Sequence, residues 1–122
     1  MHEKFWFLFL NQKESFLADH PISELTLYEI KLLELISIAH ENCTPLSVGQ
    51  ALSLKLIGSP ARVHKMLRRL LDKNFICHVH ADRNFRKKFL QPCALAYEYF
   101  DLMGKLLIRA NANTGLTPSS AQ

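Results

Sequence analysis

The chain has 122 residues, of which 48% are hydrophobic and 21% are charged, and its formal net charge is +4. This length fits one domain, and the composition excludes an intrinsically disordered chain. No apolar run approaches the roughly 20 residues that span a bilayer, and "FWFLFL" near the start lacks the cleavage site of a signal peptide. We expect a single cytoplasmic domain over residues 1–110 and a flexible tail over residues 111–122.

The cysteine content points to a reducing compartment. Cys43, Cys77 and Cys93 are an odd number of cysteines without regular spacing. This pattern argues against a disulfide framework and is typical of reduced thiols in a cytosolic protein.

Positive charge is concentrated in one segment of the chain. Residues 1–61 carry four Lys against seven acidic residues, a net charge of −3, whereas residues 62–88 carry nine Lys or Arg against two Asp, a net charge of +7. Clustering of this kind is typical of proteins that bind nucleic acid.

Large apolar side chains dominate residues 3–18, which we expect to form an N-terminal helix within residues 1–20. Pro21 follows "ADH", and proline disfavours helical geometry in the residue before it, so the helix ends there.

Two capping boxes mark the next helices. Thr26 followed by Glu29 starts a helix whose apolar stripe runs to about His40. Ser47 followed by Gln50 starts a shorter helix. The two helices are therefore expected to be separated by a short turn.

A third helix, over residues 59–73, combines an apolar face with a basic one. Ser59 can cap it, and Pro60 suits its first position because no backbone N–H is needed there. Its apolar residues recur at i, i+3, i+4, i+7 and i+8, which is one face of an α-helix. They are Val63, Met66, Leu67, Leu70 and Leu71. We expect Asn74 to end the helix in a left-handed conformation.

Two short extended runs follow, over residues 75–81 and 85–90, and the turn-forming "DRN" separates them. We expect a β-hairpin with a basic tip. Pro92 is then expected to start a last helix, within residues 92–110.

This order of elements predicts a mainly α fold with a small β-hairpin, a winged helix-turn-helix over residues 24–91 with flanking N- and C-terminal helices. In helix-turn-helix proteins the second helix of the motif lies in the major groove of DNA. We therefore expect sequence-specific binding to double-stranded DNA by a transcriptional regulator acting on a bacterial or phage-type nucleoid. The residues expected to contact DNA are Ser59, Ala61, Arg62, Lys65, Arg68, Arg69, Arg83, Arg86, Lys87 and Lys88.

The same segments resemble the MarR-like winged-helix regulators. The resemblance covers about residues 24–100 and rests on "LTLYEIKLLELI", "PLSVGQAL", "GSPARVHKMLRRLLDKNFI" and the wing "ADRNFRKKFLQP". It implies a dimeric transcriptional regulator whose terminal helices pair between subunits. The family's wing usually carries an Asp-Arg-Arg run, where this chain has "DRNFRKK". For the minor-groove contact we therefore favour Arg86 over Arg83.

The terminal segments carry more apolar surface than one small core requires, and an exposed patch of that kind favours association. We expect a homodimer formed by the two termini. Its interface residues are predicted to be Phe5, Trp6, Phe9, Phe100, Met103 and Leu107.

Other functions are less well supported by the sequence. His64 has no partner ligand at helical spacing, and on a strand His78 and His80 would share one face while Cys77 points to the other. We therefore expect no enzyme, no cofactor and no metal site. A winged helix that binds another protein, or serves phage or plasmid replication or partition, remains the alternative; a metal-sensing regulator using His78 and His80 is less favoured. No effector ligand can be named.

Overall fold

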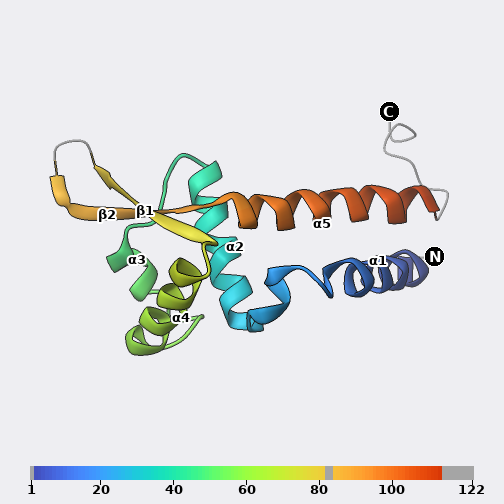
Figure 1. Ribbon diagram of the computed structural model, residues 1–122, viewed down its shortest axis with the longest axis horizontal. Helices are drawn as coiled ribbons and strands as arrows, with labels where there is room; N and C mark the ends of the chain where they lie inside the picture. The colour runs from blue at the N-terminus through green and yellow to red at the C-terminus, as the bar shows by residue number, and fades with distance from the viewer. Residues whose placement is uncertain (1, 82–83, 114–122) are drawn as a thin grey trace. The chain divides into compact units, whose positions relative to one another are not determined.

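The computed structural model describes the backbone of residues 2–81 and 84–113, and the side chains of residues 4–80 and 87–111 (Figure 1). The elements are α1 (His2–Leu17), the 3-10 helix η1 (Pro21–Glu24), α2 (Leu27–Glu41), α3 (Val48–Leu52), α4 (Pro60–Asp72), β1 (Ile76–Ala81), β2 (Asn84–Pro92) and α5 (Ala94–Asn113). The predicted fold class, mainly α with one β-hairpin, is confirmed. Residues 25–97 form one compact unit, and the two ends of the chain form another.

Side-chain caps begin the helices of the central unit, as the sequence predicts. At α2 the Thr26 hydroxyl accepts the Glu29 N–H at 3.1 Å, and the Glu29 carboxylate accepts the Thr26 N–H at 2.8 Å. Ser47 and Gln50 repeat both bonds at α3, with the same two distances. The Ser59 hydroxyl accepts the Arg62 N–H at 3.3 Å at α4. Caps of this kind each stabilise a helix by about 1 kcal/mol.

The core of this unit forms where α2, α4 and the hairpin meet. Helix α4 buries the apolar stripe that its spacing predicts, with Leu71 at its edge half-buried. The buried core residues from these elements are Leu32, Leu33, Ile36, Val63, Met66, Leu67, Leu70, Phe75, Ile76 and Leu90. After α4 the chain turns at Asn74, which adopts the expected left-handed conformation with φ of 65°.

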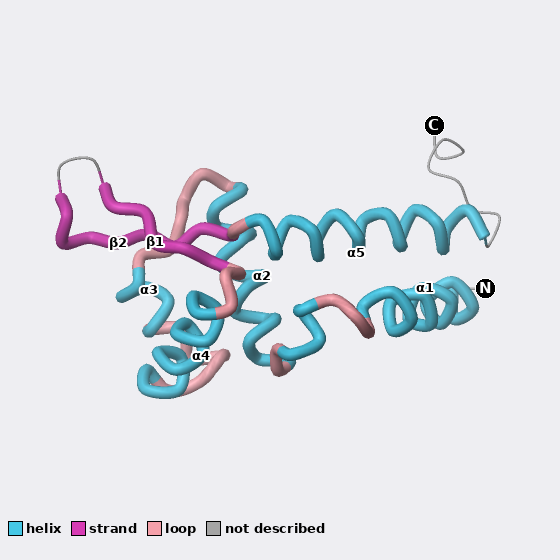
Figure 2. The backbone as a smooth tube through the Cα atoms, in the orientation of Figure 1, coloured by secondary structure: helices cyan, strands magenta, loops and turns pink. Residues whose placement is uncertain are grey.

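Strands β1 and β2 pair antiparallel, from Ile76 opposite Pro92 to His80 opposite Lys88, and the register shifts after His80 (Figure 2). The expectation that Pro92 starts the last helix is wrong. Pro92 is the final residue of β2, a strand-end position where its missing N–H leaves no gap in the ladder, and α5 starts at Ala94.

A third segment, which was not predicted from the sequence, joins the base of this hairpin. The Leu90 N–H donates to the Leu46 carbonyl at 2.8 Å, and Ser47 forms a bridge with Phe89. The chain just before α3 is thereby fixed to β2.

The unit formed by the two ends has its own apolar cluster, between α1 and α5. Phe9, Leu106 and Ala110 are buried there, and Phe5 and Met103 are among the side chains that pack on them. Within the described residues, no helix is long and apolar enough to cross a membrane.

Candidate nucleic-acid interface

Helix α4 separates two kinds of side chain on its two faces. The large apolar residues Val63, Met66, Leu67 and Leu70 are buried, whereas the polar and charged residues are exposed to solvent. The exposed residues are Ser59 at the cap and, within α4, Pro60, Ala61, Arg62, His64, Lys65, Arg68, Arg69 and Asp72. All the residues that the sequence predicted on this helix therefore lie on its accessible side.

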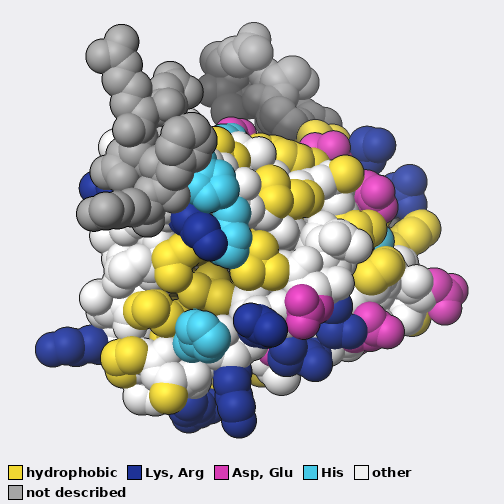
Figure 3. Space-filling model, turned by 60° about the vertical axis from the view of Figure 1, so that its left-hand side comes forward, with side chains coloured by type: hydrophobic (Ala, Val, Ile, Leu, Met, Phe, Trp, Pro, Cys, Tyr) yellow, Lys and Arg dark blue, Asp and Glu magenta, His cyan; other side chains and the backbone are white. Residues whose placement is uncertain are grey.

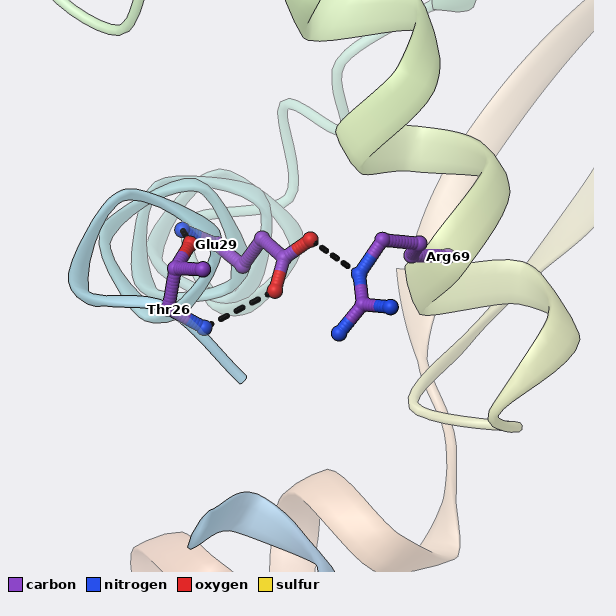
Figure 4. Close-up of polar contacts among 3 residues, drawn as sticks. All are labelled: Thr26, Glu29 and Arg69. Atoms are coloured by element: carbon purple, nitrogen blue, oxygen red, sulfur yellow. Dashed lines mark hydrogen bonds and ion pairs between the residues drawn. The ribbon is translucent and has the colours of Figure 1, made fainter. Parts of the chain in front are cut away.

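Arg69 differs from its neighbours because it makes a strong contact inside the protein. Its Nε donates to Glu29 Oε2 at 2.5 Å (Figure 4). Glu29 is only 2% exposed, and a buried carboxylate needs a positive partner. Arg69 thus neutralises Glu29, whose other oxygen caps α2 at Thr26. Arg69 joins α4 to the start of α2, a role that the sequence did not predict.

Arg62, at the N-terminal end of α4, also has a defined neighbour. Its guanidinium lies 5.9 Å from the centre of the Tyr28 ring, at the start of α2. A cation–π contact at this distance holds the guanidinium in place without removing its charge. Arg62 is consequently oriented and still exposed.

A hollow of about 500 Å³ lies between the start of α3, α4 and the hairpin. Its apolar floor includes Val48, Leu67 and Leu71. The other residues that line it are Ser47, Gly49, His64, Arg68, His78, Lys87 and Lys88. Figure 3 shows one face of the molecule, on which Lys, Arg and His side chains lie around exposed apolar side chains. Among the described residues that line the hollow none is acidic, so its described lining carries positive charge only.

The environment of His78 reflects this concentration of cations. Burial, and then the positive charges of Lys88 and His80, lower the pKa of His78 below its ordinary value. The second and third of these causes are the like charges of neighbouring cations.

The basic residues of the hairpin are only partly described. Lys87 and Lys88 are exposed, and the Lys87 ammonium lies 5.5 Å from the centre of the Phe89 ring. Arg83 lies outside the described residues, and so does the side chain of Arg86. The expected minor-groove contact of Arg86 therefore stays a prediction.

The pairing of the hairpin separates Cys77 from the histidines. His78 lies opposite Leu90 and Cys77 opposite Gln91, so His78 and His80 share one face and Cys77 lies on the other. In the part of the chain that the structure describes, no three His, Cys, Asp or Glu residues are placed to hold a metal ion.

Comparison with known proteins identifies the fold. No protein-family model and no curated protein matches this chain. Solved structures do match. The transcriptional regulator Tm0710 from Thermotoga maritima is 17% identical, with a TM-score of 0.58 over 92% of this chain and 70% of its own. FabT from Streptococcus pneumoniae, in complex with DNA, is 16% identical, with a TM-score of 0.57 over 96% and 79%.

A third match is wild-type MarR from E. coli in its apo form, which is 19% identical, with a TM-score of 0.51 over 93% of this chain and 78% of its own. The chain has a MarR-like winged-helix fold. The resemblance suggested by the sequence motifs is therefore confirmed at the level of the fold. By their order in this fold, α3 and α4 correspond to the helix-turn-helix, and the β1–β2 hairpin corresponds to the wing.

Proposed function

We propose that this winged helix binds double-stranded DNA as a transcriptional regulator, with α4 in the major groove and the wing along the adjacent backbone or minor groove. The observation that carries the proposal is the separation of side chains on α4: its large apolar residues are buried, and its four basic residues, Arg62, Lys65, Arg68 and Arg69, are all exposed. The names of two of the matched structures agree with it, one as a transcriptional regulator and one in complex with DNA. We infer a binding protein and no enzyme, working in the cytoplasm of a bacterium or on a phage genome.

The contacts inside the protein divide the predicted DNA-binding residues of α4 into two groups. Lys65 and Arg68 are exposed and make no ion pair among the residues that the structure describes. Arg69 pairs with Glu29. We therefore assign groove contacts to Lys65 and Arg68, and close backbone approach to the small residues Ser59 and Ala61. Arg62, held by Tyr28, serves at the edge of the groove.

The wing lysines provide the test of this proposal. Each of Lys87→Ala and Lys88→Ala is expected to weaken binding to all duplex sequences alike and to reduce the slope of log affinity against log salt by about 0.9, because each phosphate contact releases a condensed counterion. Fluorescence anisotropy with a labelled duplex at several salt concentrations measures this slope. Lys105→Ala is the control, because it makes the same change of charge on an exposed lysine of α5 that is not part of the unit formed by residues 25–97. Wild-type protein whose affinity does not vary with salt would contradict DNA binding.

We also propose that the chain is a homodimer formed by its two ends. The residues predicted for this interface divide into two groups. Phe9 is only 7% exposed, and the half-buried Phe5 and Met103 pack with it inside the chain. Trp6 and Leu107 are exposed, and Phe100 is half-buried. Phe7 and Ile108, which the sequence did not single out, are exposed as well.

The exposed residues of the two ends can be tested by changing them to acidic ones. Phe7→Glu combined with Ile108→Glu is expected to convert the dimer to a monomer, because a charge desolvated in an apolar interface is strongly unfavourable. Sedimentation velocity measures the change, and circular dichroism checks that the helices persist. A wild-type chain that sediments as a monomer at all concentrations would refute the dimer.

A protein-binding winged helix is the second candidate, and one observation favours it. Leu27 and Leu56 are 84% and 94% exposed, and with Tyr28 and Lys31 they line a groove of about 440 Å³. Exposed apolar side chains of this size are common at protein interfaces. The salt-dependence experiment separates the two candidates, because this groove lies on residues other than the basic ones assigned to DNA.

A further inference from the structure

Two of the three cysteines lie next to each other at the base of the wing. Cys77 is on β1 and faces Gln91 across the ladder, so Cys93, two residues beyond Gln91, is its diagonal neighbour on the same face. The Cys93 N–H donates to the Phe75 carbonyl at 2.9 Å, which holds the backbone of Cys93 beside β1. Both thiols are free and half-buried, so small reagents reach them. This pair was not predicted from the sequence, in which three cysteines without regular spacing argued against a disulfide framework.

The surroundings of the two sulfurs differ, and the difference gives them separate roles. Burial, and then a hydrogen bond with Cys77, raise the pKa of the Cys93 thiol to about 11. Cys93 therefore keeps its proton at neutral pH and donates it toward Cys77, since a hydrogen bond raises the pKa of the group whose neutral form it favours. Gln91 Nε2 also donates to the Cys77 sulfur, at 3.4 Å. Two hydrogen-bond donors, the Cys93 thiol and the Gln91 amide, therefore point at the Cys77 sulfur.

We propose that Cys77 and Cys93 are a redox-active pair, which a hydroperoxide oxidises to an intramolecular disulfide at the base of the wing. The Cys77 thiolate attacks one oxygen of hydrogen peroxide, the O–O bond breaks, and the released hydroxide takes up a proton to leave as water. Cys77 is then a sulfenic acid. The Cys93 sulfur attacks the Cys77 sulfur, the S–O bond breaks, and the hydroxide leaves as water with the Cys93 proton. Two thiols lose two electrons, and one peroxide gains them.

Closing this disulfide moves the chain at one defined place. Diagonal neighbours in a ladder have Cα atoms roughly 7–8 Å apart, whereas a disulfide needs roughly 4.4–6.8 Å. Cys93 lies beyond Pro92, the last paired residue of β2, and directly before α5. Cys93 is therefore the partner that moves, and its N–H bond to the Phe75 carbonyl adjusts with it. Oxidation draws the start of α5 toward β1 and fixes it there.

The proposal can be tested by peptide mapping, without any measurement of DNA binding. The full chain is treated with hydrogen peroxide, remaining thiols are blocked with iodoacetamide, and the protein is digested with trypsin. Cleavage after Lys55, Lys73 and Lys88 puts the three cysteines on separate peptides. Mass spectrometry is expected to find the Cys77 and Cys93 peptides joined, with the loss of two hydrogen atoms, and dithiothreitol is expected to separate them again. Cys43 is expected to carry the alkyl group.

Matched serine variants control the experiment. Cys43→Ser is expected to leave the linked peptides unchanged, whereas Cys77→Ser and Cys93→Ser each abolish them. In Cys93→Ser the sulfenic acid on Cys77 persists and reacts with dimedone, while in Cys77→Ser dimedone labels nothing at Cys93. Circular dichroism of each variant checks its folding. Linked peptides that contain Cys43, or links found only between two copies of the chain, would overturn the proposal, and so would independent oxidation of Cys77 and Cys93 in the wild-type chain.

Discussion

Replacing Arg69 by alanine is expected to lower the free energy of unfolding by about 2–3 kcal/mol, although Arg69 lies on the surface helix α4. The substitution leaves the Glu29 carboxylate buried without its positive partner, and breaking a buried pair in this way costs about 3–5 kcal/mol. We take a smaller value because the Arg69 side chain is 47% exposed, so water screens part of the interaction. Urea unfolding followed by circular dichroism measures the change.

Two comparisons isolate the ion pair from other effects of the substitution. Arg68→Ala removes the same charge from the next position of α4, where the side chain is exposed, and is expected to change stability by less than about 0.5 kcal/mol. Glu29→Gln can keep the capping hydrogen bond with Thr26 while removing the buried charge, so it is expected to cost less than Arg69→Ala. If Arg69→Ala were as stable as Arg68→Ala, the ion pair would have no structural role. Loss of DNA binding in Arg69→Ala would then reflect a direct contact.

Local signals in the sequence were sufficient to predict most of the elements. Both capping boxes, the Ser59 cap and the left-handed Asn74 form as expected, because each depends on residues within one or two turns of the chain. The apolar periodicity of α4 predicted which of its side chains are buried, since only one face of an isolated helix can join a core.

Features that depend on tertiary contacts could not be predicted in this way. Arg69 and Glu29 are 40 positions apart, and nothing in either segment shows that they meet. The pairing of Cys77 with Cys93 depends on the register of the hairpin, which shifts after His80. The aromatic residues of α1 looked equivalent in the sequence, yet the structure buries Phe9 and exposes Trp6. Arg69, for example, lies on the predicted exposed face of α4 but has a structural role, because Glu29 of α2 forms an ion pair with it.

Lys65→Ala and Arg68→Ala are each expected to reduce affinity for a specific duplex by roughly 5- to 150-fold, with unchanged folding. A bidentate contact to a base edge is worth about 1–3 kcal/mol of discrimination, and each 1.4 kcal/mol corresponds to a factor of ten. Both side chains are exposed, and within the described structure neither is held by an ion pair, so their removal leaves no buried group unsatisfied. Selection of bound sequences from random duplex DNA, followed by anisotropy titrations on the selected site, measures both affinity and preference.

The pattern of losses across the surface distinguishes base recognition from simple charge attraction. If Lys65 and Arg68 contact base edges, their alanine variants lose affinity for the selected site more than for random DNA, and the preference at the contacted base relaxes. Lys87→Ala, on the wing, is expected to weaken both by the same factor, because phosphates carry no sequence information. Equal losses on both duplexes for all three variants would mean that α4 binds only the backbone. Sequence specificity would then have to come from the deformability of the DNA or from the wing. The other two arginines of α4 already make contacts inside the protein, Arg62 with Tyr28 and Arg69 with Glu29.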